Sequence, residues 1–413
     1  IISTAKTLPD GSYFYYGGDI SVTGTGSLLT SADTSAQIEA SGDFTVQTSG
    51  SVHANLSKLR ARNITIAAGA TVSASGLSGF STGLYDGSDS GQGAPHGGAG
   101  GDDASAVGSD PYGTAQQPLS FGAQGESGTS AGGLGGGLLR LLASDTITVD
   151  GTVSADGAPG TAGVPFGGGG GSGGSIWLIA PTLVGGGALS ATGGNGGDAA
   201  FGSNGGGGAG GRVAYHTDNN NFSGTLTVAA GLTGSGGGSP AGDGSDGTTY
   251  AGPHPSQPGT LVFRTTTTYS GNLGGLTGAD SSCQAAAKQV GLGGIWLAII
   301  SDTEVAAHHR LTVAGPIRDR NHTTIASTAD NFWNGSWLAP IASGPNAGSS
   351  SSQDHWTGSD VDGTVATDTC HEWTSANAGT FGQTGEHTMA GGDGLSSSPS
   401  SCATPLALLC FHQ

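Results

Sequence analysis

A 37-residue repeat constrains the fold of this chain more than any other feature of its sequence. Leu139, Ile176 and Val213 lie 37 residues apart and occupy equivalent positions in three short apolar runs. A second alternating run follows each of them, and earlier copies occur at 63–74 and 43–52. Because apolar and polar residues alternate with a period of two, these runs are predicted to be strands with one apolar face. Short strands repeated at constant length, without helices between them, are typical of a parallel β-solenoid, and the crossover rule makes it right-handed.

Glycine tracts return once in each repeat, at 167–174 and 205–211, at the same place relative to the strands. Glycine tolerates positive φ and lets neighbouring backbones approach closely. Three structures stay open for the tracts: a tight corner, extended three-fold helices bonded to one another in the polyproline II form, or an irregular surface loop. Residues 77–137, rich in Gly, Ser and Asp without a strand pattern, are predicted to be an insertion along the rod.

The distribution of glycine, cysteine and tryptophan indicates two domains. Of the 83 glycines, 64 lie in residues 1–263, whereas all four cysteines and five of the six tryptophans lie in residues 264–413. Each segment is long enough to bury a core of its own. We therefore expect a glycine-rich parallel β-solenoid over 1–263, a second domain of different type over 264–413, and a chain that is mainly β.

Charge and cysteine content narrow the class of protein. Eleven Lys and Arg against 30 Asp and Glu give a net charge of −19, so no basic face for nucleic acid is expected. No run approaches the ~18 apolar residues of a transmembrane helix. Because the chain begins at Ile1 without a basic and apolar leader, we interpret it as a mature secreted form. Four cysteines without a CxxC pair favour two disulfides in an oxidising compartment, with four buried reduced thiols as the alternative.

The second domain is predicted to open with a helix. Ser281 and Gln284 form a capping box at its start, and Gly291 ends it. A buried strand at 295–301 and a closing strand at 406–411 follow. The residues between these two strands are loop-rich.

The motifs of the second domain occur in an order that is fairly specific. They are, along the chain, residues 269–283, Trp296-Leu-Ala, Ser301-Asp, Asn331-Phe-Trp, Leu338-Ala-Pro-Ile, Trp356-Thr-Gly, Cys370-His-Glu-Trp-Thr-Ser and Leu409-Cys-Phe-His-Gln. This order resembles the C-type-lectin-like domains of uncharacterised bacterial surface proteins, known especially from spirochaetes. The resemblance covers about residues 260–413 and implies a small α+β fold with two disulfides, Cys283 with Cys410 and Cys370 with Cys402. The glycine-rich solenoid is similar, less specifically, to repeats in secreted or surface proteins of Gram-negative bacteria.

One departure from the lectin pattern limits what the resemblance implies. Calcium-dependent sugar binding in that family uses Glu-Pro-Asn or Gln-Pro-Asp together with Trp-Asn-Asp, and Trp333 is followed here by Asn-Gly. Neither proline tripeptide occurs, so sugar recognition through calcium is not implied, and the fold also serves as a protein-binding or structural module. The candidate ligand-binding residues are the tryptophans of this domain, Trp333, Trp337, Trp356 and Trp373.

Two patterns in the first domain are candidates for chemistry. Residues 193–201 fit the nonapeptide calcium loop with Asp198 as the metal ligand, although a single copy is also explained by chance. Lys58, Arg60 and Arg62 alternate on one strand face, where a polysaccharide lyase would need its base, with a solvated face as the alternative. No H-E-x-x-H motif occurs. We therefore predict a protein that is not an enzyme and has no cofactor, unless Asp198 binds Ca²⁺.

These features predict a secreted or cell-surface bacterial protein with a structural and adhesive role. The ends of a solenoid expose strand edges that pair with other chains, and residues 1–16 hold short extended segments suited to donation into a neighbour. The predicted partner is another copy of the chain, in a homopolymer or end-to-end assembly, while the lectin-like head contacts surface glycans, proteins or subunits. A monomeric adhesin and a secreted carbohydrate-binding or polysaccharide-degrading protein are the alternatives.

Overall fold

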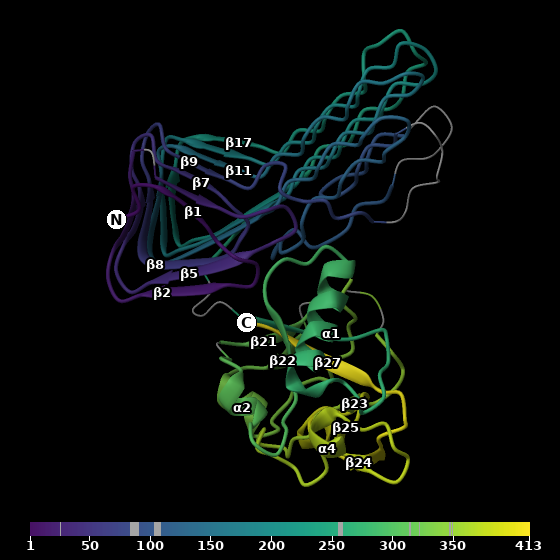
Figure 1. Ribbon diagram of the computed structural model, residues 1–413. Helices are drawn as coiled ribbons and strands as arrows, with labels where there is room; N and C mark the ends of the chain where they lie inside the picture. Colours follow the sequence, from purple (N-terminus) through teal and green to yellow (C-terminus); the bar gives the residue numbers. More distant parts are fainter. Residues whose placement is uncertain are drawn as a thin grey trace. The chain divides into compact units, whose positions relative to one another are not determined.

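The chain divides into two compact units in the computed structural model (Figure 1). Unit 1 comprises Ile1–Pro255 with Gly291–Gly294, and unit 2 comprises Ser256–Val290 with Ile295–Gln413. The boundary expected after residue 263 falls within the strand β19 (Thr260–Arg264). The structure describes residues 1–24, 26–82, 91–102, 109–254, 259–313, 315–321, 323–346, 348 and 350–413.

Unit 1 contains two large parallel sheets that share one core (Figure 1). The short sheet has the strand order β1-β4-β7-β9-β11-β14-β17. Its strands are β1 (Ala5–Thr7), β4 (Ser27–Leu29), β7 (Ser51–His53), β9 (Thr71–Ser73), β11 (Thr152–Ser154), β14 (Ala188–Ser190) and β17 (Thr225–Thr227). Along the chain, each strand of the short sheet is followed by strands of the long sheet before the next strand of the short sheet. Neighbouring strands of the short sheet therefore run in the same direction, and every pair is parallel.

The long sheet follows the order β18-β15-β12-β10-β8-β5-β2, with β3, β6, β13 and β16 beside this path. The strands on the path are β2 (Tyr13–Tyr16), β5 (Ala36–Ala40), β8 (Leu56–Ile66), β10 (Leu138–Val149), β12 (Ser175–Ile179), β15 (Arg212–His216) and β18 (Thr248–Gly252). The strands beside it are β3 (Ile20–Val22), β6 (Phe44–Val46), β13 (Thr182–Gly185) and β16 (Asn219–Phe222). Both sheets are therefore extended stacks of short parallel strands.

The 37-residue register predicted from the sequence is confirmed in the later strands. Leu139 pairs with Ile176, and Ile176 pairs with Val213. All three side chains are fully buried in the core between the sheets. The second runs also align, since Thr146 pairs with both Asn63 and Thr182.

The repeat is shorter at the start of unit 1. Tyr13 pairs with Gln37, 24 residues later, and Gln37 pairs with Lys58 after a further 21. Leu141 and Leu178, by contrast, are paired across 37 residues. The early repeats are shorter because they carry no glycine arm, so the strands of one repeat need little more than 20 residues.

The glycine tracts form three-fold helices that bond to one another. Within 167–174, every third backbone N–H donates in the same direction: Gly167 and Gly170 donate to Ser203 and Gly206, at 3.1 and 2.9 Å. The next two sets of N–H groups donate to two other segments, through Gly168, Gly171 and Gly174 to residues 155–161, and through Gly169 and Ser172 to residues 123–126. A period of three, with hydrogen bonds between neighbouring segments and none within a segment, is the polyproline II form. Of the three structures open for the tracts, this one is observed, and the arms run side by side away from the sheets (Figure 1).

Part of the predicted insertion belongs to the same bundle. The N–H groups of Gly91 and Ala94 donate to the carbonyls of Gly167 and Gly170, at 3.2 and 2.9 Å. Farther along, Gly133 donates to Gly169 at 2.8 Å. The described parts of residues 77–137 thus supply additional three-fold helices rather than a loop on the surface of the sheets.

Unit 2 is built around a sheet in the order β22-β21-β19-β27-β23-β25, with β20 also paired to β27. The sheet strands are β20 (Trp296–Ala298), β21 (Ile317–Asp319), β22 (Thr324–Ala326), β23 (His355–Trp356), β25 (Thr384–Gly385) and β27 (Ala407–His412), besides β19. The other elements are α1 (Gly275–Gln289), α2 (Ala307–Arg310), α3 (Ala329–Trp333), β24 (Phe381–Gly382), α4 (Cys370–Trp373), a 3₁₀ turn at Gly392–Gly394 and β26 (Ser400–Ser401). The predicted closing strand is β27, which lies at the centre of the sheet.

The helix α1 begins earlier than predicted, and the expected capping box is wrong. Gly274 precedes the first turn, and no side chain caps it. Ser281 lies inside the helix and donates its hydroxyl to the carbonyl of Thr277 at 2.8 Å. Gln284 accepts a hydrogen bond from the backbone N–H of Trp296 at 2.9 Å. Of the two side chains that suggested a cap, Gln284 therefore ties the helix to β20, whereas Ser281 bonds within the helix.

The four cysteines form the two disulfides that the family resemblance implies. Cys283 of α1 bonds to Cys410 of β27, and Cys370 bonds to Cys402. Each joins segments that are far apart in the sequence. In the chain-entropy argument, closing loops of 127 and 32 residues stabilises the fold by about 5 and about 4 kcal/mol.

Of the helices in the described parts of the chain, none combines the length and apolarity that crossing a bilayer requires.

Candidate functional site

The strand β2, at one end of the long sheet, exposes four consecutive aromatic side chains. Tyr13, Phe14, Tyr15 and Tyr16 are exposed by 52, 41, 61 and 56%. The strand pairs with β5 on one side, and it ends the path of the sheet on the other. An unpaired strand edge with exposed apolar side chains is a surface on which another strand can pair.

Strand register assigns the four aromatic residues to two faces. Phe14 is aligned with Ile38, which is buried in the core, so Phe14 and Tyr16 continue the inner face at the end of the core. Tyr13 lies on the outer face, where its hydroxyl donates to the Glu39 carboxylate at 3.2 Å. The inner face of β2 therefore presents two exposed aromatic rings at the end of the core.

The basic residues considered as a lyase site are held in ion pairs on the same outer face. Glu39 lies 3.7 Å from Lys58 and 3.6 Å from Arg60. Arg62 donates its Nε–H to Asp43 at 2.9 Å. Burial lowers the pKa of Lys58, and the Glu39 carboxylate opposes that shift. Each cation thus has a carboxylate partner from an earlier repeat, which favours the solvated-face interpretation.

The first residues of the chain, which belong to the segment 1–16 predicted to pair with a neighbouring copy, pair with unit 1 itself. Ile2 forms a parallel bridge with Val22, and β1 pairs with β4. Ile2 also packs against the core. Lys6, at the centre of β1, is aligned with Leu28 and is exposed. The N-terminal segment is therefore the outermost strand of the short sheet.

The opposite end of unit 1 is formed by β16, β17 and β18. In the described residues, β17 and β18 end their sheet paths, and β16 pairs only with β13. Thr225 and Thr227 are exposed, whereas Leu226 between them packs against the core and is partly buried. Among the described residues, both ends of unit 1 thus have strands with an unpaired edge and apolar side chains that are only partly buried.

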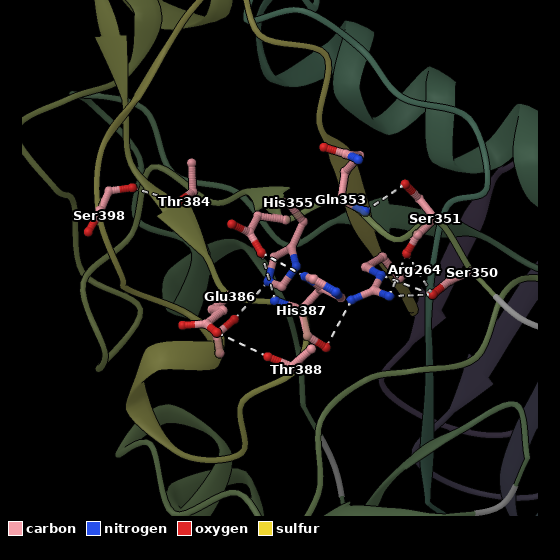
Figure 2. A network of polar contacts seen from close by, with 12 residues as sticks. Arg264, Ser350, Ser351, Gln353, His355, Thr384, Glu386, His387, Thr388 and Ser398 are labelled. Atoms are coloured by element: carbon pink, nitrogen blue, oxygen red, sulfur yellow. Dashed lines mark hydrogen bonds and ion pairs between the residues drawn. The ribbon is translucent and has the colours of Figure 1, made fainter.

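In unit 2, a network of polar contacts surrounds Arg264, at the end of β19 (Figure 2). Its guanidinium donates to the hydroxyl of Ser350 at 2.6 Å and to the carbonyls of Ser351 and His387, at 2.7 and 3.1 Å. Burial lowers the pKa of Arg264 to about 10, with Asp354 acting in the opposite direction. The side chain therefore stays charged at neutral pH.

Two histidines complete this network, and both are occupied by structural contacts. His387 lies with its Nδ1 at 2.8 Å from the Asp354 carboxylate. His355 is buried with its Nε2 at 2.7 Å from the carbonyl of Gly394, and burial lowers its pKa to about 4. Neutral His355 and charged Arg264 both bind backbone carbonyls. Their geometry thus fits the anchoring of loops to the sheet better than it fits proton transfer.

Neither this network nor its central residue, Arg264, was predicted from the sequence. The signal was available, because an arginine closes the apolar run of residues 260–263, and a charged residue at the end of a buried strand needs several acceptors. The acceptors come from residues 350–351 and 387, which are loop positions without a pattern.

Three of the four tryptophans proposed for ligand binding are core residues. Trp337, Trp356 and Trp373 are buried, and the two last rings lie 5.7 Å apart. Their Nε1–H groups donate to the carbonyls of Phe332, Tyr269 and Ser301, respectively, at 2.9, 2.8 and 2.7 Å. A ring that is packed on all sides and has its only donor bound cannot present a face to a ligand.

Trp333 differs from the other three because it is partly exposed. It packs edge-to-face against Phe332 at 4.9 Å and lies 6.3 Å from His308. Of the four proposed tryptophans, it is the one that the fold leaves accessible.

Asp198 connects two neighbouring arms of the bundle. Its carboxylate accepts hydrogen bonds from the backbone N–H and the hydroxyl of Ser235, at 2.6 and 3.2 Å. Within the described ranges, no group of three or more His, Cys, Asp or Glu is arranged to hold a metal ion. The contact with Ser235 gives Asp198 a structural role that requires no metal.

A scan of the chain against protein-family models found no match, and a search of curated proteins found no matching protein.

Proposed function

We propose that this protein is an extracellular structural and adhesive component of a bacterial surface. In this proposal unit 1 is a right-handed parallel β-solenoid that serves as a stalk and associates with further copies into a fibre or appendage. Unit 2 is a C-type-lectin-like head that contacts ligands or neighbouring subunits. The exposed aromatic strand β2 at an unpaired sheet edge is the observation that carries the proposal.

Three further observations support a stalk outside the cell. Two disulfides suit an oxidising compartment. The arms of three-fold helices are cross-linked by backbone hydrogen bonds along their length, which makes a stiff body without large side chains. The small number of charged side chains leaves most of the surface to neutral polar groups, as suits a protein packed against other copies.

For the head, Trp333 is the proposed contact residue, because its ring is partly exposed on unit 2. The absence of the calcium-dependent sugar motifs from the sequence favours a protein or subunit ligand over a calcium-bound sugar. We also propose that the chain is not an enzyme: Lys58, Arg60 and Arg62, the candidate bases, are held in ion pairs. This pairing removes the main support for a polysaccharide-degrading function.

Light scattering of the full-length protein tests self-association. The net charge of −19 opposes contact between copies, so association should strengthen from low to moderate salt as this repulsion is screened. Replacing both Phe14 and Tyr16 with Ser should weaken it at least tenfold, because these residues lie at the end of the core. The matched control is Phe201→Ser, which removes another aromatic ring of unit 1 that is 61% exposed. A protein that stays monomeric at high concentration in both salts contradicts the fibre proposal and leaves a monomeric adhesin.

A further inference from the structure

We propose that copies join head to tail, with the β17–β18 end of one unit 1 stacked on the β1–β2 end of the next in the register of the chain's own repeats. The inference rests on the self-association proposed above and defines its geometry. It predicts which residues of the two ends meet.

Each end of unit 1 exposes one strand of each sheet. At one end these strands are β1 and β2, and at the other, among the described residues, they are β17 and β18. Each of the four strands has a neighbour along its sheet path on one side only. A second copy can therefore pair with both sheets at the same time.

The two sheets have matching strand counts. Among the described residues, the short sheet has seven strands, and the long-sheet path from β2 to β18 also has seven. The two sheets therefore extend over the same number of strands, so a second copy stacked on either end can continue both sheets together.

The direction of the strands selects a head-to-tail joint over a two-fold joint. All described strand pairs of unit 1 are parallel. Stacking the two different ends keeps every new pair parallel, with a spacing of ~4.8 Å. Stacking two identical ends about a two-fold axis would make the new pairs antiparallel. A head-to-tail joint of this kind does not close and generates a filament.

The residue alignment between neighbouring strands within unit 1 predicts the alignment between the end strands of two copies. In the short sheet, Thr7 is aligned with Leu29, and Ser190 with Thr227, through an unbroken series of paired residues. Thr227 of one copy should therefore lie opposite Thr7 of the next. In the long sheet, the same continuation places Ala251 opposite Phe14.

The side chain of Lys6 weakens the proposed contact between copies and so determines its affinity. Lys6 lies in the column of inward residues that ends in Leu226 at the other end of unit 1. Stacking brings its aliphatic stem against Leu226, while its ammonium group must turn outward to water. An inward-pointing lysine on an edge strand limits pairing. The joint is therefore reversible, with an affinity that residue 6 controls.

Cysteine cross-linking tests the joint. Two full-length variants, Thr7→Cys and Thr227→Cys, are mixed under mild oxidation and separated on a non-reducing gel. Both threonines are exposed, so the nearly isosteric changes should not affect folding. Aligned residues ~4.8 Å apart are within the Cα range of a disulfide. The control replaces Thr227→Cys with Thr225→Cys, on the same face of β17 but two residues out of register, beyond ~7 Å from Thr7.

The proposal expects a cross-linked dimer in the Thr7 and Thr227 mixture, at least tenfold more abundant than with Thr225, and none in either variant alone. Cross-linking of Thr7→Cys with itself would show a two-fold joint and overturn the proposal. Association in light scattering without the Thr7–Thr227 product would overturn the register while leaving self-association standing. Monomers in both experiments would overturn both.

Discussion

Lys6 of β1 is aligned with Leu28 of β4, at the end of a column of buried aliphatic side chains that continues through Val52 and Val72. Every other aligned position in the column is apolar, and the lysine occupies the one that faces the end of the sheet. A charged side chain at this position disfavours the burial of the core end of unit 1 against another copy.

Replacing Lys6 with Leu should therefore tighten self-association. The change removes an inward charge and adds a side chain whose burial contributes ~1.5–3 kcal/mol, which corresponds to roughly tenfold or more in the association constant. Sedimentation velocity over a range of concentrations measures the effect. Lys6→Arg keeps the charge and should leave the constant unchanged; equal behaviour of all three proteins would exclude β1 from the joint.

The glycine bundle should be intolerant of a single added methyl group. A Cβ built on Gly170 would lie 2.0 Å from the carbonyl oxygen of Gly194, and one on Gly208 would lie 2.1 Å from that of Gly171. These atoms belong to hydrogen-bonded backbones that cannot move apart independently. Gly170→Ala should destabilise unit 1 by about 3 kcal/mol, the upper part of the range for overpacking.

Gly186 provides the matched control for this substitution, since a Cβ there meets only the Ser223 hydroxyl oxygen, at 3.9 Å. Gly186→Ala should leave the midpoint of thermal unfolding within a few degrees of the parent. Comparable losses in the two variants would mean that the tracts do not form the closely bonded helices described above.

The inner and outer faces of the strands should respond differently to a charge. Ile176 is fully buried, so Ile176→Asp introduces an unpaired carboxylate into the core and should unfold unit 1. Thr182 is half-buried on the next strand, β13, and Thr182→Asp should change stability by less than ~1 kcal/mol. Circular dichroism and urea unfolding distinguish the two. Similar damage from both changes would contradict the assigned faces.

Unit 1 should lose stability as the pH falls below about 6.5, because His96 is neutral in the fold. Burial lowers its pKa to about 3, with the Arg212 cation as the second cause, and its Nδ1 lies 2.7 Å from the carbonyl of Gly173. The unfolded chain binds a proton near pH 6.5 whereas the folded chain does not, so stability falls progressively from about pH 6.5 toward pH 3.

Hydrogen exchange of the amides at 167–174, measured between pH 7 and 5 and corrected for intrinsic rates, follows this loss. The range stays above the titration of most carboxylates. His96→Gln removes the titrating group and keeps a donor for Gly173, so its protection should depend less on pH. An identical pH dependence in both proteins would show that His96 does not cause it.

The parts of the fold that local pattern determines were predictable from the sequence. The alternation around Ile176 and Val213 specifies strand, inner face and register together, because a shift by one residue would turn every apolar side chain outward. The start of α1 was not predictable. Gly274 and Gly275 both have positive φ, 82° and 75°, and the first turn has low intrinsic helix propensity. The contact of Gln284 with Trp296 supplies the stabilisation from outside the helix.

The tryptophans show why the candidate site was less predictable than the fold. Composition indicates that Trp356 and Trp373 matter, but it does not tell a ligand platform from a core. What decides is whether a carbonyl reaches the Nε1–H, and the carbonyls of Tyr269 and Ser301 come from 87 and 72 residues away. The pairing of β1 was unpredictable for the same reason, because its partner β4 is a separate strand farther along the chain.

Electron microscopy of the purified full-length protein at moderate salt tests the central claim most directly, through the axial repeat of the assembled material. Seven strands per copy at ~4.8 Å each give a repeat of about 34 Å along the stacking direction. The account predicts filaments with this repeat and one copy per repeat. Isolated particles at every concentration, or filaments whose repeat is twice this length and contains two copies related by a two-fold axis, would contradict it.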